Sequence, residues 1–303
     1  MSLPDSLNIP ILRNIFHPSD FTPASEAAFA HALRAALMAQ ANLTILHVSS
    51  DRDAEWMEFP GVRAALERWG LLPMNSRRSD VAKLGIHIRK VQAVHPDPIE
   101  SVTSYLAEHV TDLIVLAIDQ SKGCLPWLSK SVATPVALES RQMTLFIPKG
   151  AAGFVSSHDG SVSLTNILIP VASKPSGQAA LQAAVRMAYR LHRPIGVFTV
   201  LHVGEEGDMP DLHYSDMPGW QWDTVITQGD VVDAICGTAE EIKADLIVMT
   251  TEGRHGFLDA LRGSHSERVL HKTPCPLLAI PAGGFIASVL EAESESRATT
   301  PQS

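Results

Sequence analysis

The sequence has few cysteines, no membrane-length apolar run and no cluster of basic residues. Its three cysteines, Cys124, Cys236 and Cys275, are scattered and form no CxxC pair. A disulfide framework is therefore not expected. The protein is expected in a reducing, cytoplasmic environment. No apolar stretch approaches the roughly 20 residues that cross a bilayer. The first residues also lack the apolar core of a signal peptide, so neither a membrane protein nor a secreted one is predicted.

The charge balance is acidic, with 24 Lys and Arg against 33 Asp and Glu and a formal net charge of −9. Few cations are available to release counterions from a phosphate backbone, so nucleic-acid binding is not expected. The sequence also lacks HExxH and Cys/His metal spacings, a Walker A motif, GxGxxG and a nucleophile elbow. We therefore predict no metal site and no catalytic residue.

The chain contains two copies of one unit. Three blocks match in the same order: 14–18 with 166–170, 46–48 with 201–203, and 112–115 with 245–248. The offset is 152 residues in the first block, 155 in the second and 133 in the third. Matches that keep their order indicate an internal repeat. The offset falls by 22 residues between the second and third blocks, so the second copy is shorter there. We therefore predict that the second copy has no helix across 204–220.

Within each copy, apolar strands alternate with helices, which is typical of an α/β fold with a parallel sheet covered on both faces. In the first copy the predicted strands are 14–18, 43–48, 86–94, 113–118 and 144–147, and the predicted helices begin at Pro23 or span 62–69 and 99–109. Asp97 and Asp230 each precede a helix and are interpreted as N-caps. His47 and His202 end the second strands and are interpreted as structural.

A length of 303 residues suggests about two domains. We place the first domain at 1–148 and the second at 164–285. Residues 149–163 are rich in Gly, Ser and Ala and are predicted to be a linker. Residues 286–303 are predicted to be a disordered tail.

The most informative segment follows the fourth strand of the second copy. Leu246–Met249 runs into the turn Gly253-Arg254-His255-Gly256, and Gly263-Ser264 then opens a helix, with Ser264 and Glu267 spaced as a capping box. Backbone N–H groups at such a helix start can hold phosphate. The alternative is that the glycines are ordinary turn residues and Ser264 only caps its helix. His255 and His265 either contact phosphate or are surface histidines.

This segment, together with the closing strand 275–281 (CPLLAIP), resembles the universal stress protein family. The resemblance implies two flavodoxin-like (Rossmann-like) doubly wound parallel five-stranded sheets with strand order 3-2-1-4-5. Ligands of such sheets bind beyond the strand ends at the switch point, here between strands one and four. The spacer between the second Gly and Gly-Ser is six residues, Phe257–Arg262, whereas the family usually has nine. The loop over the phosphates is therefore expected to be about one helical turn shorter.

The resemblance also implies which residues bind a nucleotide in the second domain. They are Gly253, Arg254, His255, Gly256, Gly263, Ser264 and His265, with Val171 and Ala172 after the first strand. The family's usual Asp in a P-x-D pattern is Asp20 in the first copy but Ala172 in the second. The first copy keeps only Gly123 of the glycines and has Gln120 and Lys130 instead. Its Lys122 and Lys130 are either phosphate ligands or solvated side chains, so we expect weak binding in the second domain only.

The implied function is stress-responsive binding of ATP or AMP, with Mg²⁺ if the ligand is ATP. The alternatives are a nucleotide-free interaction or scaffold protein of the stress response, and a slow ATPase, for which no general base stands out. The resemblance further implies that the final strands, 144–147 and 277–280, meet across a pseudo-two-fold axis. The expected assembly is an intramolecular pseudo-dimer, to which a homodimer of chains or an unknown protein partner can be added.

Overall fold

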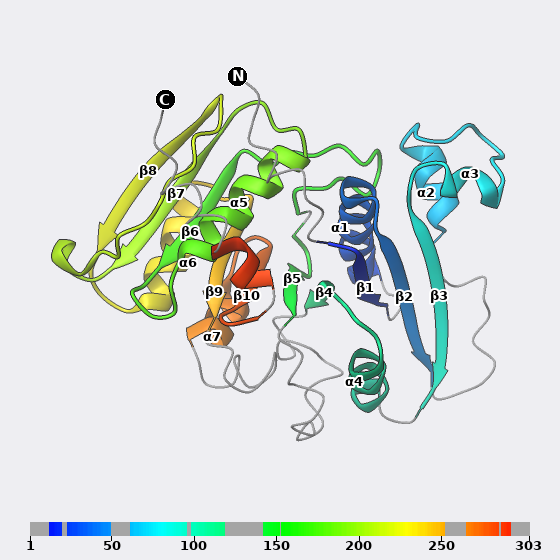
Figure 1. The fold of residues 1–303 in the computed structure, drawn as a ribbon, viewed down its shortest axis with the longest axis horizontal. Helices are drawn as coiled ribbons and strands as arrows, with labels where there is room; N and C mark the ends of the chain where they lie inside the picture. The colour runs from blue at the N-terminus through cyan, green and yellow to red at the C-terminus, as the bar shows by residue number, and fades with distance from the viewer. Residues whose placement is uncertain are drawn as a thin grey trace. The chain divides into compact units, whose positions relative to one another are not determined.

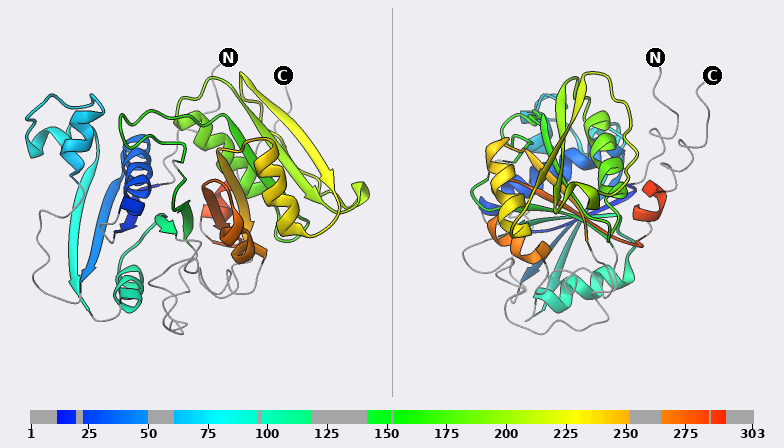
Figure 2. Two further views of the ribbon diagram at one scale, coloured as in Figure 1. Left: turned by 180° about the vertical axis from the view of Figure 1, so that it is seen from behind. Right: turned by 90° about the vertical axis from the view of Figure 1, so that its left-hand side faces the viewer.

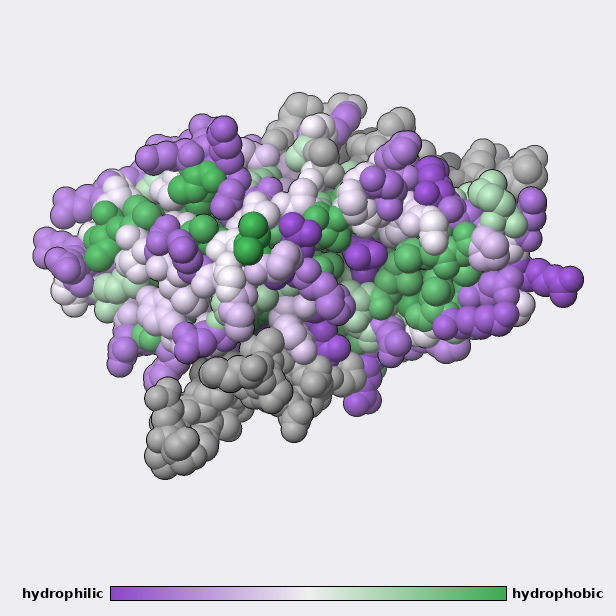
Figure 3. Space-filling model, turned by 90° about the horizontal axis from the view of Figure 1, so that it is seen from above, coloured by the Kyte–Doolittle hydropathy of each residue, from purple (hydrophilic) through white to green (hydrophobic). Residues whose placement is uncertain are grey.

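The computed structural model describes residues 12–19, 23–49, 61–95, 98–118, 142–151, 153–251, 265–284 and 286–291. The chain divides into two compact units (Figure 1). The first unit comprises Ile11–Ser140 with Thr144–Ser163, and the second is built mainly from Leu164–Ser303. Seen from above (Figure 3), hydrophobic and hydrophilic residues alternate over the surface, apart from one larger hydrophobic patch on the first unit. Within the described residues, no helix is long and apolar enough to cross a bilayer.

The first unit is a parallel sheet with strand order β3-β2-β1-β4-β5, as predicted. Its elements are β1 (Asn14–Pro18), α1 (Pro23–Ala39), β2 (Asn42–Ser49), α2 (Val62–Arg68), α3 (Arg78–Ala82), β3 (His87–Val94), α4 (Pro98–Glu108), β4 (Leu113–Ile118) and β5 (Met143–Pro148). Helix α1 packs on β1, β2 and β4, and α4 packs on β2. Strands β4 and β5 are almost wholly buried, which explains their continuous apolar sequence.

The second unit has the same order, β8-β7-β6-β9-β10. Its elements are β6 (Asn166–Val171), α5 (Gln178–Arg190), β7 (Gly196–Val203), the 3₁₀ turn η4 (Glu206–Asp208), β8 (Trp220–Thr227), α6 (Val231–Glu241), β9 (Leu246–Thr251), α7 (His265–Lys272) and β10 (Leu277–Pro281). The right-hand view of Figure 2 shows α5 on one side of this sheet and α6 with α7 on the other. The doubly wound α/β fold predicted from the sequence is therefore confirmed.

The two units differ where the repeat offset changes. Between β2 and β3 the first unit has α2 and α3, whereas between β7 and β8 the second has only the three-residue turn η4. The predicted loss of a helix across 204–220 is confirmed.

One aspartate is used in the same way in both units. The Oδ2 atom of Asp112 accepts hydrogen bonds from the backbone N–H groups of Arg13 and Asn14, both at 2.8 Å. Asp245 accepts from the N–H groups of Thr165 and Asn166 at 2.7 and 2.9 Å. Each carboxylate thus joins the start of strand four to the start of strand one. This shared contact explains why the Asp-Leu-Ile-Val block occurs in both copies of the sequence.

The segment predicted to be a linker belongs to the first unit. His31 of α1 receives hydrogen bonds at its Nε2 atom from the backbone N–H groups of Phe154 and Val155, at 3.1 and 3.2 Å. Further along, the indole of Trp69 donates to the carbonyl of Ser157 at 3.2 Å. These contacts place the domain boundary after Ser163 and not after Pro148. A segment's content of Gly, Ser and Ala does not reveal such contacts.

The predicted tail also needs a correction at its start. Residues 286–291 are helical, and Ile286, Ala287 and Leu290 are buried. Three apolar side chains at helical spacing account for this order. The segment from Ile286 to Glu291 is therefore structured, whereas residues 292–303 lie outside the described residues.

Candidate functional site

The second unit has a topological switch point at β6. This strand lies between β7 and β9, and the chain leaves it through α5 on one face but reaches β9 through α6 on the other. Beyond the carboxyl ends of β6 and β9 the chain goes to helices on opposite faces, to α5 after β6 and to α7 after β9. In open α/β sheets this divergence creates the crevice in which ligands bind.

Three strand ends place their side chains in one row at this edge. Val171 of β6 pairs in register with His202 of β7. β6 pairs with β9 at Ile167–Leu246 and Leu168–Ile247, and counting on three residues along both strands puts Thr250 at the level of Val171. Residues at the same register position of parallel strands face the same side of the sheet. Val171 faces the start of α5, because a Cβ added to Gly177 would lie 2.6 Å from its Cγ1 atom.

Two polar atoms in this row are buried and have no hydrogen-bond partner among the residues that the structure describes. They are Nε2 of His202 and Oγ1 of Thr250, on side chains that are only 6% and 8% exposed. The other ring nitrogen of His202, Nδ1, lies 3.4 Å from the carbonyl oxygen of Val171. A carbonyl only accepts, so this contact requires a proton on Nδ1, and in the neutral ring Nε2 is then an acceptor. Buried polar groups are seldom left unpaired, and each such group calls for an explanation.

The loop between β6 and α5 is short and lies over the strand end. Ala172 forms an isolated bridge with Ser176, and the hydroxyl of Ser176 accepts from the N–H of Gln178 at 3.3 Å. The methyl group of Ala172 is exposed. A longer polar side chain at this position would therefore extend into solvent at the edge of the sheet.

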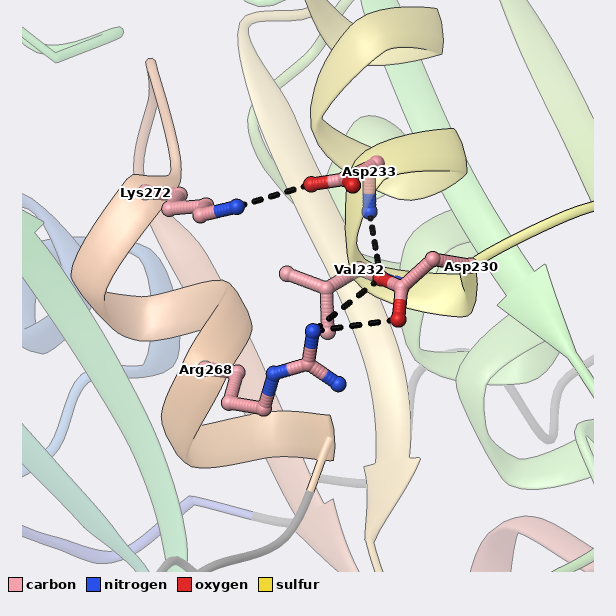
Figure 4. A network of polar contacts seen from close by, with 5 residues as sticks. All are labelled: Asp230, Val232, Asp233, Arg268 and Lys272. Carbon is pink, nitrogen blue, oxygen red and sulfur yellow. Dashed lines mark hydrogen bonds and ion pairs between the residues drawn. The ribbon is translucent and has the colours of Figure 1, made fainter.

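Ion pairs attach helix α7 to helix α6 (Figure 4). Asp230 accepts from the N–H groups of Val232 and Asp233 at 2.9 and 3.1 Å, which confirms it as the N-cap of α6. It also pairs with Arg268 of α7 at 3.0 Å, and Lys272 pairs with Asp233 at 2.7 Å. The backbone N–H of Asp233, and then Arg268, hold the pKa of Asp230 below its usual value. These pairs fix the helix that directly follows the Gly263-Ser264 motif.

The profile of the Universal stress protein family matches residues 12–148 and 218–281, which is more than half of the chain. The chain belongs to the universal stress protein family.

Individual relatives agree. Universal stress protein Sll1654 of Synechocystis is 24% identical over 151 residues, covering 44% of this chain and 95% of that protein. A universal stress protein from Archaeoglobus fulgidus superposes with a TM-score of 0.53 at 17% identity, covering 89% of this chain and 98% of that one. A functionally unknown protein from Pseudomonas aeruginosa, PA1789, gives 0.59 at 16% identity, covering 96% and 100%. At these identities the two structures support the fold alone.

The structure describes part of the site that the family resemblance implies. Val171 and Ala172 lie at the switch point, and His265 begins α7. Residues 252–264, with Gly253, Arg254, His255, Gly256, Gly263 and Ser264, lie outside the described residues. Sequence reasoning gave His202 a purely structural role and did not single out Thr250. Their positions at strand ends beside the switch point are the signal that identifies them.

The corresponding edge of the first unit is described less fully. Nδ1 of His47 lies 2.8 Å from the carbonyl oxygen of Ser19, which repeats the contact between His202 and Val171. The residues on which the comparison of the two sites depends, Asp20, Asp97, Gln120, Lys122, Gly123 and Lys130, lie outside the described residues. In the part of the chain that the structure describes, no group of three His, Cys, Asp or Glu side chains could hold a metal ion.

Proposed function

We propose that the second unit of this universal stress protein binds an adenine nucleotide, ATP or AMP, weakly and acts as a sensor in the stress response. One observation carries the proposal. The row of strand ends at the switch point contains two buried polar atoms, Nε2 of His202 and Oγ1 of Thr250, that have no hydrogen-bond partner in the part of the protein that the structure describes. A ligand bound at this edge would supply those partners.

The chemistry of the two atoms fits a nucleoside. Nε2 of His202 requires a donor, whereas the hydroxyl of Thr250 donates and accepts. Ribose hydroxyls and the exocyclic amine of adenine offer donors, and ring nitrogens offer acceptors. The phosphates would meet the backbone of Gly253, Gly256, Gly263 and Ser264, at the start of the helix that Asp230 and Arg268 hold in place.

Weak binding follows from Ala172, which stands where the family usually has an aspartate. A hydrogen bond to a charged group contributes about 1.5–3 kcal/mol. Its loss lowers affinity by about ten- to a hundredfold. With ATP, Mg²⁺ would bind through the phosphates. The alternative remains a nucleotide-free scaffold protein, in which a water molecule satisfies the two atoms.

Calorimetry with ATP and AMP on the intact protein and on Thr250→Val tests the proposal. Valine keeps the shape but removes the hydroxyl, so we expect about tenfold weaker binding with unchanged or slightly raised thermal stability. Gly256→Val should abolish binding, and Gly123→Val, its counterpart in the first copy, should not affect it. Two nucleotides per chain, or equal affinity in all variants, would contradict the assignment. Absence of binding in every protein would favour the scaffold.

A further inference from the structure

We infer that two copies of this chain pair through β8, the outermost strand of the second unit's sheet, and form a homodimer. The strand order of that sheet ends at β8, which pairs with β7 and, within the described residues, with no other strand. Figure 1 shows β8 at the outer limit of this sheet. A strand at the edge of a sheet presents N–H and C=O groups that can pair with another strand.

The backbone of β8 faces the open edge at every second residue. The N–H of Gly204, which follows β7, donates to the carbonyl of Thr227 at 2.8 Å. Successive residues of a strand direct their backbone groups to opposite sides, so Thr227 and every second residue before it face β7. The backbone groups of Trp222, Thr224 and Ile226 therefore point away from β7, toward the open edge.

β8 lacks the side chains that usually protect an edge strand. Its sequence, WQWDTVIT, has no Lys, Arg or Pro and includes one charged residue, Asp223. The edge strand of the first unit, β3, instead carries His87, Arg89 and Lys90. Charged side chains, lysine above all, and proline are common devices against pairing between edges. Of the two edge strands, β8 is therefore the one suited to pairing.

The side chains of β8 are accessible and include apolar ones. Ile226 is 38% exposed, and Gln221, Asp223 and Thr224 are exposed as well. Six of the eight residues of β8 are aromatic or β-branched, types that are enriched in strands. Pairing would cover apolar surface that the second unit leaves in contact with water.

The edge is also held in place before any partner binds. The rings of Trp220 and Trp222 lie 4.3 and 4.5 Å from that of Phe198 on β7. The indole N–H of Trp220 donates to the carbonyl of Arg193 at 3.0 Å, and that of Trp222 to the carbonyl of Ser215 at 3.1 Å. A strand fixed in its extended conformation loses little conformational entropy when it pairs.

One antiparallel register makes this edge complementary to itself. With Thr224 on a two-fold axis, Thr224 lies opposite Thr224 of the second copy, and Trp222 lies opposite Ile226. Since the backbone of all three residues faces outward, each pair exchanges two N–H···O hydrogen bonds. Pairs of threonines and pairs of an aromatic with a β-branched residue are favourable across strands. Asp223 lies opposite Val225, so like charges do not meet. This self-complementarity favours a second copy of the chain over an unrelated strand.

Sedimentation velocity of the full chain between about 1 and 200 µM tests the proposal, which does not depend on nucleotide binding. Eight residues make a small interface, so we expect a monomer–dimer equilibrium with a Kd of about 10 µM. Thr224→Pro should weaken the dimer at least about a hundredfold and leave the fold intact, because the lost N–H faces the open edge. Val225→Pro is the matched control. Its N–H faces β7, so this variant should lower the thermal stability of the monomer.

A chain that stays monomeric at the highest concentration, or a folded Thr224→Pro protein that dimerises as tightly as the unchanged one, would overturn the proposal. A monomeric chain that pairs only with an added valine-rich peptide would overturn it too, because the edge would then accept foreign strands and not its own copy.

Cysteine cross-linking tests the register in a Cys124→Ser background, where the remaining cysteines, Cys236 and Cys275, are buried. Thr224→Cys should form a disulfide-linked dimer on mild oxidation, because its Cα atom would lie about 5.5 Å from that of the second copy. Ile226→Cys is the matched control, exposed on the same edge but about 14 Å from its counterpart. Equal cross-linking at the two positions would show random collision and overturn the proposed pairing.

Discussion

The two units have the same strand order, but they differ in what surrounds the sheet. The first unit has two helices between its second and third strands and a segment, 153–163, packed on α1. The second has a 3₁₀ turn in place of the helices. The aspartates Asp112 and Asp245, by contrast, make the same contacts in both. Contacts that align the strands are kept, and differences are confined to connections, where loops and sites vary most easily.

The strand-end histidines also differ between the two units. His47 and His202 both contact the backbone carbonyl at the end of the neighbouring strand, at 2.8 and 3.4 Å. The shorter contact belongs to the unit whose glycine motif is degenerate. The longer one belongs to the unit in which Nε2 of His202 and Oγ1 of Thr250 have no hydrogen-bond partner among the described residues.

The largest effect is expected from His31→Ala, which removes a contact present only in the first unit. The imidazole is 2% exposed and accepts two buried N–H groups, from Phe154 and Val155. Each unpaired N–H costs about 1–3 kcal/mol, and the cavity adds to this. We expect the free energy of unfolding of the first unit to fall by about 4 kcal/mol. Urea unfolding followed by hydrogen exchange in each unit measures this fall.

His109→Ala is the matched control for His31→Ala. His109 also contacts the carbonyl four residues earlier, that of Tyr105, and stacks on that ring, but it is only half-buried. Its loss should cost less than about 1 kcal/mol. If both variants lose the same stability, the 153–163 segment is not fixed by His31.

The same histidine should make the first unit sensitive to acid. Burial lowers the pKa of His31 to about 4, although the bond to the carbonyl of Ala27 opposes this. The unfolded chain takes up the proton near pH 6.5, so stability is complete above that value and is lost as the pH falls toward 4. The loss is about 3 kcal/mol by linkage. Between about pH 7 and 4.5, the free energy of unfolding should change less with pH in His31→Gln than in the unchanged protein. Equal pH dependence in the two proteins would contradict this role of His31.

Periodicity and repeats predicted most of the fold, whereas contacts between distant segments escaped prediction. The strand 113–118 and the missing helix follow from apolar runs and offsets within the sequence. The contact between His31 and Phe154 joins residues 123 positions apart, and nothing local signals it. Helix α3 has five residues, too few to show a period. The row of strand ends at the candidate site depends on strand register, which one sequence does not reveal.

Asp245→Ala tests the feature that the two units share. Its Oδ2 atom accepts from two N–H groups and from the hydroxyl of Thr165 at 3.0 Å, whereas Asp112 accepts from two N–H groups. We expect the second unit to lose about 2 kcal/mol, and the first to lose slightly less on Asp112→Ala. Asp216→Ala, at an exposed position, should change stability by less than about 0.5 kcal/mol. If Asp245→Ala destabilised the first unit, or Asp112→Ala the second, the proposed role of these aspartates would be refuted.

The smallest effect concerns the acidic residue that the second unit lacks. Ala172 is exposed at the end of β6, so an aspartate fits there without burial or strain. If a nucleotide binds at this edge, Ala172→Asp should restore a charged hydrogen-bond acceptor and raise ATP affinity about tenfold, or about 1.4 kcal/mol. Ala172→Asn separates the two contributions, because it restores an acceptor of the same shape without the charge. Calorimetry should rank the affinities Asp, then Asn, then Ala, for AMP as well as ATP. A carboxylate that only repelled the phosphates would weaken ATP more than AMP, and this outcome would place the phosphates, not the nucleoside, beside Ala172.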